Sequence, residues 1–284
     1  RLGGRGEGGH VHGWDEPRLP ALSGLRRGGV PAAAIRDFCS RVGVTRKENV
    51  IDVVQLETCI REALEQDAPR ALAVLRPLKV VIENYPADQT DWLDAPNHPQ
   101  RPELGSRQLP FGREIYIERD DFMLDPPKDF YRLAPGREVR LRFAYFIRCE
   151  RVVTDPASGE VLELICSYDP ATRGGNAPDG RKVKGTIHWA DARHALRAQV
   201  RLYDRLFAVP DPAGETDYLA QRNPDSLQVL TDCLLEPALA GASAGYQFER
   251  LGYFAPDPDS RPAAPVWNRT VSLRDTWAKL AARG

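Results

Sequence analysis

Residues Gly180–Phe207 read GRKVKGTIHWADARHALRAQVRLYDRLF, and they carry more information about the fold than any other stretch of the chain. Within them, Val183–Trp189 and Gln199–Phe207 are short runs rich in β-branched and aromatic residues, the pattern of half-buried strands. These strands hold more charged and aromatic side chains than a packed core requires. We therefore expect them to do more than fill a core.

Further short strands are predicted between Leu78 and this stretch. They are Val80–Ile82, Ile115–Ile117, Val139–Ile147 and Val161–Cys166. Turn sequences separate them: Asp155–Gly159 (DPASG) predicts a hairpin, and Gly174–Gly180 (GGNAPDG) predicts a longer loop. Many short strands punctuated in this way are typical of β-barrels or of a β-sandwich.

The first third of the chain predicts helices. One begins near Pro31 and ends at Gly43, and its apolar stripe is Ile35, Phe38, Cys39 and Val42. A second helix, with Asn49 as its cap, has the stripe Val53, Leu56, Ile60 and Leu64. A third, shorter helix is expected from Asp67 to Pro77. The simplest role for these stripes is packing into a core.

Composition limits the class of protein. The 284 residues are 42% hydrophobic, which suffices for one large domain or two ordinary ones. The five cysteines are scattered and form no CxxC pair, which argues against a disulfide framework and a zinc site. No segment has the roughly 20 apolar residues of a membrane span, and no signal peptide is visible. We therefore expect a soluble protein of the reducing cytoplasm.

The charge distribution matters more than the total. The formal net charge is −1, so only local patches could attract nucleic acid. Two groups of basic residues are candidate patches, with the acidic residues concentrated elsewhere, and solvated strand faces are the alternative explanation. The first group is Arg137, Arg140, Arg142, Arg148 and Arg151, and the second is Arg181, Lys182 and Lys184.

Five further motifs accompany Gly180–Phe207. They are Gly13–Pro20 (GWDEPRLP), Gly24–Gly28 (GLRRG), Asn97–Pro99 (NHP), Gly105–Phe111 (GSRQLPF) and Val266–Trp277 (VWNRTVSLRDTW). With these motifs in order from Gly13 to Lys279, the chain resembles the carboxy-terminal half of a glutaminyl-tRNA synthetase. The resemblance implies an α+β fold: a small helical connecting domain over residues 1–77, then an anticodon-binding region of two antiparallel β-barrels over residues 78–284. The distal barrel would span roughly 119–190, and flanking segments would build the proximal barrel.

By this resemblance, the intact enzyme joins glutamine to tRNA(Gln), with ATP, bound with magnesium, hydrolysed to AMP and pyrophosphate. The family's catalytic domain carries a HIGH-type and an MSK-type motif, and neither occurs in this sequence. We therefore expect a catalytic domain upstream in the same polypeptide. This chain alone is expected to be inactive, without catalytic residues, cofactor or metal. Its expected partner is tRNA(Gln), bound by a monomer, with no DNA or membrane partner.

Arginines near turns and strands are the candidate reading groups. Single-stranded RNA is read by splaying out bases, stacking them and hydrogen-bonding their edges, which suits the planar guanidinium. Arg140 and Arg142 are two residues apart in a predicted strand and should share one face. By resemblance, these two match positions at the first anticodon base, and Arg132 matches one at the third base. Arg70 and Gln247 match positions at the middle uridine.

Other positions are expected to support this contact. By resemblance, Glu249 and Arg250 belong to the same YQFER segment as the glutamine and would orient the reading groups. Arg46 and Lys47 lie between two predicted helices and match positions inside the tRNA elbow, although a solvated loop explains them equally well. Lys182 is expected to meet a phosphate.

The histidines and an aromatic residue complete the candidates. His10 and His12 form an HxH pair without a third ligand in reach, so a metal site is not expected. His98 and His188 are expected to make structural hydrogen bonds. Phe130 is a candidate for base stacking.

Two other functions stay open at this stage. The anticodon-binding half of a glutamyl-tRNA synthetase of eukaryotic or archaeal type shares the fold, and the choice of amino acid is made in the catalytic half. A stand-alone RNA-binding module without a ligase partner is the second alternative.

Overall fold

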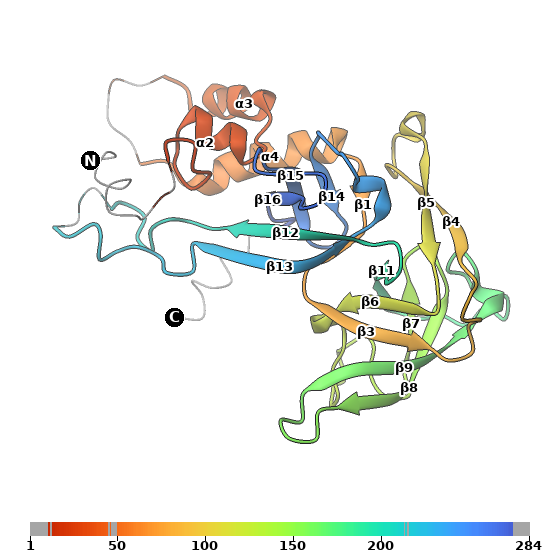
Figure 1. The fold of residues 1–284 in the computed structure, drawn as a ribbon. Helices are drawn as coiled ribbons and strands as arrows, with labels where there is room; N and C mark the ends of the chain where they lie inside the picture. Colours follow the sequence, from red (N-terminus) through yellow and green to blue (C-terminus); the bar gives the residue numbers. More distant parts are fainter. Residues whose placement is uncertain are drawn as a thin grey trace. The chain divides into compact units, whose positions relative to one another are not determined.

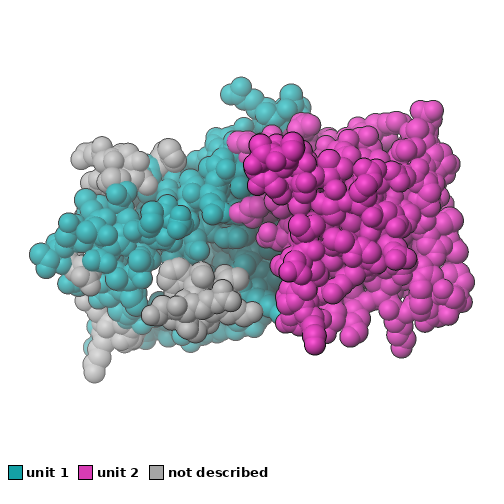
Figure 2. Space-filling model, turned by 90° about the horizontal axis from the view of Figure 1, so that it is seen from below, with its two compact units in different colours: residues 1–69, 199–230, 242–284 teal, residues 70–198, 231–241 magenta. Residues whose placement is uncertain are grey.

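The computed structural model describes residues 11, 13–44, 46, 50–212, 214 and 216–274. The chain divides into two compact units, coloured separately in Figure 2. Unit 1 comprises residues 1–69, 199–230 and 242–284, and unit 2 comprises residues 70–198 and 231–241. A few helices and two nearly closed, barrel-like sheets make up the fold, so the predicted α+β class with two barrels is confirmed.

In the described part of unit 1, three α-helices precede the strands: α2 (Leu22–Arg27), α3 (Ala32–Val42) and α4 (Val53–Asp67) (Figure 1). Pro31 precedes the first turn of α3, and Gly43, at a φ of 73°, ends it as predicted. The Asp52 carboxylate caps α4, because it accepts a hydrogen bond from the backbone N–H of Val54 at 2.9 Å. The predicted cap, Asn49, lies outside the described residues. None of the described helices combines the length and apolar character needed to cross a membrane.

Strands of unit 1 pack against these helices through β15 (Gly252–Pro256) and β16 (Val266–Val271). The strand order is β14 (Tyr246–Phe248), β15, β16, β12 (Leu196–Tyr203) and β13 (Leu227–Leu235), of which β12 begins and β13 ends in unit 2. β15 is antiparallel to β14 and β16, whereas β12 is parallel to β16. Ala34 of α3 and Ile60 of α4 share a buried cluster with Tyr253 and Val271 of the sheet. Phe38, Leu56 and Leu64 of the predicted stripes are partly buried against this cluster. Cys39 and Val53, predicted in the same stripes, are exposed.

A buried ion pair joins α2 to the sheet within unit 1. The carboxylate of Asp257, a residue that is 2% exposed, accepts hydrogen bonds from Nε and Nη2 of Arg27 at 2.9 and 3.0 Å. Asn268 Nδ2 donates to the same carboxylate, and Arg201 Nη1 lies 3.4 Å from it. Burial raises the pKa of Asp257, but the hydrogen bonds from Arg27 and Asn268 outweigh burial and lower this pKa to about 2.

A matched pair of aspartate variants tests this ion pair. Asp257→Ala should lower the free energy of unfolding by about 3–5 kcal/mol, because Arg27 loses its buried partner. Asp259 contacts the same two arginines, Arg27 at 2.8 Å and Arg201 at 2.9 Å, but its side chain is 52% exposed. Asp259→Ala should therefore cost at most about 1 kcal/mol.

The effect of Asp257→Ala should also depend on pH. The folded-state pKa of about 2 lies below the unfolded value of about 3.9, so the ionised carboxylate stabilises the fold above about pH 4. That contribution should disappear as the pH falls toward about 2. Urea titrations at several pH values measure both effects, and equal losses in the two variants would contradict the assignment.

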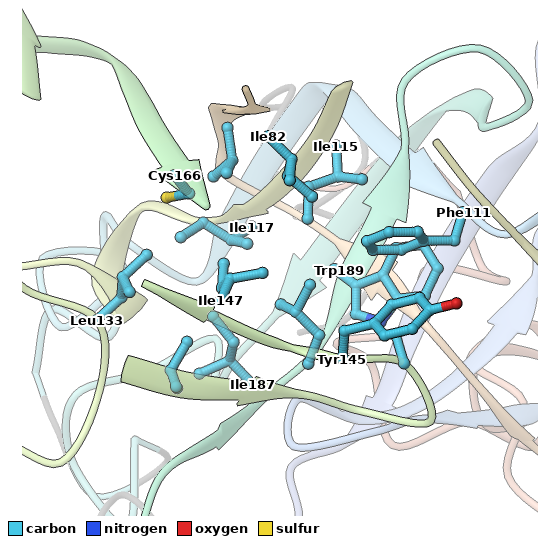
Figure 3. Packing of buried hydrophobic residues seen from close by; sticks show 14 of the residues in the cluster. Ile82, Phe111, Ile115, Ile117, Leu133, Tyr145, Ile147, Cys166, Ile187 and Trp189 are labelled. Carbon is cyan, nitrogen blue, oxygen red and sulfur yellow. The ribbon is translucent and has the colours of Figure 1, made fainter. Parts of the chain in front are cut away.

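Unit 2 contains a seven-stranded sheet, whose order is β10 (Thr186–Ile187), β7 (Glu138–Leu141), β8 (Phe146–Thr154), β9 (Val161–Asp169), β3 (Pro77–Ile82), β6 (Glu114–Glu118) and β11 (Trp189–Asp191). The first and last of these strands, β10 and β11, are separated in the chain by His188 alone. The two edges of the sheet must therefore meet, which nearly closes the barrel. Ile117, Ile147 and Ile187 lie among the packed side chains that fill it (Figure 3).

Glu118, at the end of β6, bonds to the residue at which the barrel closes. One of its carboxylate oxygens lies 3.4 Å from Nε2 of His188, and the carboxylate accepts the backbone N–H groups of Leu75 at 2.6 Å and Arg76 at 3.1 Å. Burial raises the pKa of Glu118, but these hydrogen bonds outweigh burial and hold it below its usual value. This contact agrees with the structural role expected for His188.

The helix predicted from Asp67 to Pro77 is wrong. Two short strands follow α4 instead, β1 (Arg70–Ala71) and β2 (Ala73–Val74). Buried carboxylates take the backbone N–H groups that a helix would use: Leu72 N donates to Glu236 Oε2 at 2.7 Å, and Leu75 N donates to Glu118. Both carboxylates come from distant parts of the sequence, so the local pattern of residues 67–77 could not reveal them and wrongly indicated a helix.

Two hairpins complete unit 2. β4 (Asp91–Pro96) and β5 (Ser106–Phe111) form a separate two-stranded sheet, the yellow arm in Figure 1. β8 and β9 are joined at DPASG, where Asp155 Oδ1 accepts the N–H groups of Ala157 and Ser158 at 2.7 and 2.8 Å. The predicted hairpin at Asp155–Gly159 is thus confirmed. Short 3₁₀ turns are Pro102–Leu104, Arg119–Asp121, Pro170–Thr172 and Pro237–Leu239.

Candidate nucleic-acid interface

A row of side chains crosses unit 2 from β7 to β9. Arg140 of β7 is paired with Phe146 of β8, which is paired with Asp169 of β9. Directly paired residues of neighbouring strands share one face of a sheet, so these three side chains lie on one face. The guanidinium carbons of Arg140 and Arg181 both lie 5.3 Å from the centre of the Phe146 ring.

Arg140 is held in place without an acidic partner. No ion pair of Arg140 is found within the described residues, and its buried Nε has no hydrogen-bond partner there. Its backbone N–H donates to Gly185 O at 3.0 Å. A Cβ at Gly175 would lie 3.1 Å from Arg140 Cδ, so the glycine lets this loop approach the side chain. A guanidinium that forms no ion pair in the described chain is suited to bind a base edge or a phosphate.

Arg142 lies one residue beyond β7, so its placement within the same strand as Arg140 is wrong. The strand ends at Leu141, and Phe143 follows with a φ of 64°. Arg142 N nevertheless donates to Ile187 O at 2.9 Å, which continues the pairing of Arg140 with the same neighbouring segment. The exposed guanidinium of Arg142 lies 4.5 Å from the Phe143 ring.

Three carboxylates enclose Arg181. Its Nε and Nη2 lie 3.2 and 3.3 Å from the two carboxylate oxygens of Glu138. Nη2 also lies 2.6 Å from Asp169 Oδ2, and Nη1 lies 2.7 Å from Asp179 Oδ2. Hydrogen bonds from Arg181 lower the pKa of both aspartates. The sequence analysis placed the acidic residues away from the basic patches, and this prediction is wrong for Arg181.

Arg132 extends from a segment that touches the turn before β10. Gly185 lies so close to Tyr131 O that a Cβ there would be 1.8 Å from it, which explains the glycine. Arg132 Nη1 donates to Asp120 O at 2.9 Å, and Nε lies 3.3 Å from Asp121 Oδ1. The Arg132 side chain is still 46% exposed.

The lysines of the second patch lie on the same turn. Lys184 Nζ lies 4.6 Å from the centre of the Tyr131 ring, and Lys182 is exposed. The predicted residues Arg132, Arg140 and Lys182 thus come from adjacent segments of unit 2.

Gln247 lies in β14 of unit 1, and its amide nitrogen is already engaged. Nε2 donates to Tyr253 Oη at 2.8 Å and to Glu65 Oε2 at 3.3 Å, and the Tyr253 hydroxyl also donates to Glu65. The turn after β14 holds Glu249, which is half-buried, and Arg250, which is exposed at a φ of 70°.

The remaining candidates are less informative. Arg70 begins β1 in unit 2, is 5% exposed, and donates its backbone N–H to Asn97 O at 2.6 Å. Arg46 is exposed. Lys47, His10 and His12 lie outside the described residues.

Comparison with known proteins agrees with this architecture. Residues 68–169 match the family described as tRNA synthetases class I (E and Q), anti-codon binding domain, and residues 186–257 match a second family of the same description. Glutamine--tRNA ligases of Nitrobacter winogradskyi, Bradyrhizobium diazoefficiens and Yersinia pestis are 59%, 55% and 55% identical over 279, 278 and 276 residues. This chain belongs to the class I glutaminyl-tRNA synthetase family.

The alignments cover 98%, 97% and 96% of this chain but 50%, 50% and 49% of those three relatives. The chain thus spans about half the length of the curated relatives it matches. It carries the anticodon-binding domains of the glutaminyl-tRNA synthetase family. The glutamine ligases among its relatives favour this reading over a glutamyl-type enzyme and over a stand-alone module.

The structure of this synthetase half also holds a buried ion pair that the sequence did not predict. Arg107 Nη2 lies 3.1 Å from Glu236 Oε2, and Arg107 Nε also donates to Glu236. Their side chains are 8% and 3% exposed. The contact of the Phe146 ring with Arg140 and Arg181 was likewise not predicted from the sequence. No local signal marks either feature, because both depend on residues brought together by the sheet.

A pair of arginine variants should separate reading groups from structural groups. Arg140→Ala removes no ion pair found in the described chain, so it should lower the free energy of unfolding by at most about 1 kcal/mol, the value of its contact with Phe146. Arg107→Ala should cost about 3–5 kcal/mol, because it leaves Glu236 buried without its cation. Chemical denaturation measures both, and a larger loss for Arg140→Ala would show that Arg140 is structural.

Proposed function

We propose that this chain reads the anticodon of tRNA(Gln) within a glutamine–tRNA ligase. The intact enzyme would join glutamine to tRNA(Gln), with ATP, bound with magnesium, hydrolysed to AMP and pyrophosphate. The observation that carries the proposal is Arg140, a fixed guanidinium with no ion pair in the described chain. With a net charge of −1, local groups of this kind must supply the recognition.

In this proposal, residues of unit 2 contact the first and third anticodon bases. Arg140 and Arg142 contact the first base, since a guanidinium can donate two parallel hydrogen bonds to a base edge. Arg132 contacts the third base. Its anchoring on Asp120 and Asp121 would reduce the entropy lost when RNA binds.

The middle uridine is assigned to Arg70 and Gln247, with Glu249 and Arg250 orienting the reading groups. Uridine presents an N3–H donor, which needs an acceptor. Because Gln247 Nε2 already donates to Tyr253 and Glu65, its carbonyl oxygen is the group we assign to that N–H.

Other parts of the proposal concern the whole protein. We infer a catalytic domain upstream in the same polypeptide, a monomeric enzyme and a cytoplasmic location. Arg46 and Lys47 would contact the tRNA elbow, and Lys182 a phosphate. The division into a helical connecting domain over 1–77 and two barrels over 78–284, the distal one roughly 119–190, stays a prediction.

Binding of anticodon stem-loops tests the function. The chain should bind a glutamine-tRNA anticodon stem-loop more tightly than one with adenine in place of the middle uridine. Fluorescence titration at fixed salt measures the two affinities. Equal affinities would reject anticodon reading by this chain.

Two variants refine that test. Arg140→Ala should reduce discrimination at the first anticodon base by about 1–3 kcal/mol, the range for a lost bidentate arginine–base contact. Lys182→Ala should weaken all stem-loops alike and reduce the salt slope by about one, because a phosphate contact carries no sequence information. If both variants show the same profile across anticodons, their roles are assigned wrongly.

Adenylate formation tests the expected inactivity of the chain by itself. Because the sequence contains no HIGH-type or MSK-type motif, the chain should show no glutamine-dependent ATP–pyrophosphate exchange. Isotope exchange measures this directly. Exchange above the background of a sample without glutamine would contradict the prediction.

A further inference from the structure

Arg140 shares its face of the sheet with two carboxylates, and no ion pair joins them to it in the described chain. Glu138 is two residues earlier in β7, so its side chain points to the same face of the sheet as that of Arg140. Asp169 lies on that face as well, paired with Phe146, which is itself paired with Arg140. An arginine so near to acids on one sheet face would ordinarily form ion pairs with them.

These acids form ion pairs with Arg181 instead. It binds both oxygens of Glu138, at 3.2 and 3.3 Å, and one oxygen each of Asp169 and Asp179, at 2.6 and 2.7 Å. All three of its guanidinium nitrogens are used in these contacts. Its guanidinium carbon lies as far from the Phe146 ring centre as that of Arg140, at 5.3 Å. Two cations therefore lie beside one ring, and the acids are bonded to Arg181.

We propose that Arg181 is a positioning residue that keeps Glu138 and Asp169 from capturing Arg140, and so leaves the Arg140 guanidinium available to the first anticodon base. The inference rests on the proposed function. Without Arg181, the two carboxylates would lose their cation, and Arg140 lies on the same sheet face and beside the same Phe146 ring as Arg181. A bidentate ion pair with either acid would use the donors that read the base.

The test measures discrimination, defined as the ratio of dissociation constants for two anticodon stem-loops that differ only in a pyrimidine or a purine at the first position. Arg181→Ala should reduce this ratio by roughly 5- to 150-fold, the value of one bidentate arginine–base contact. Adding Glu138→Gln and Asp169→Asn to Arg181→Ala should restore the ratio to within about twofold of the original chain, because neither of the two carboxylates on the sheet face of Arg140 then competes for it.

A charge-matched control comes from the same unit. Arg101 forms an ion pair with Glu103 at 2.8 Å in the segment between β4 and β5, so Arg101→Ala removes the same charge at a residue outside both basic patches. It should leave the ratio unchanged. If Arg181→Ala does not fold, as judged by circular dichroism, Arg181→Gln keeps a similar length without the charge and carries the same expectations.

Each outcome decides the proposal. If the Arg181 variant discriminates between the two stem-loops as well as the original chain does, the positioning role is overturned and the proposed function stands. This holds with or without a uniform loss of affinity. A lost ratio that the added Glu138 and Asp169 changes do not restore also overturns it, since the loss then reflects general damage to the site. No discrimination in the unchanged chain rejects the proposed function itself.

Discussion

The barrel of unit 2 depends on the contact between Glu118 and His188. His188 is the residue at which the chain crosses between the edge strands β10 and β11, and Glu118 lies at the end of β6, the neighbour of β11. The same carboxylate also binds the backbone N–H groups of Leu75 and Arg76. A buried carboxylate with several donors holds its charge and fixes each donor, because leaving any of them unsatisfied is costly.

This closure sets the position of the candidate reading groups. Once β10 is in place, its parallel pairing with β7 aligns Thr186 with Arg140 and Ile187 with Leu141. The backbone of Gly185, just before β10, then receives the N–H of Arg140. Arg140 is therefore placed by main-chain hydrogen bonds rather than by an acid, which leaves its side-chain donors for a ligand.

The sequence patterns predicted correctly only those helices and turns that interactions between neighbouring residues determine. The helices α3 and α4 follow from apolar stripes, and the β8–β9 hairpin follows from the turn chemistry of Asp155. The segment 67–77 failed because Glu236 and Glu118, far away in sequence, bind its N–H groups. The basic patch around Arg181 failed partly for the same reason: Glu138 and Asp169 meet Arg181 only when β7 and β9 take their places in the sheet. Asp179 is two residues from Arg181 in the sequence, and this local partner was overlooked.

Strand register links these observations, since a slip of one residue between β7 and β8 would turn Phe146 to the opposite face from Arg140. The β8–β9 ladder is irregular between Cys149 and Arg151 and again between Val153 and Thr154, toward the hairpin end. At the other end the pairing of Phe146 with Asp169 is regular. Both irregularities thus lie beyond the row of Arg140, Phe146 and Asp169, and the two arginines lie beside the same ring. The recognition proposed for this unit therefore depends on the strand register as much as on the charge of any one arginine.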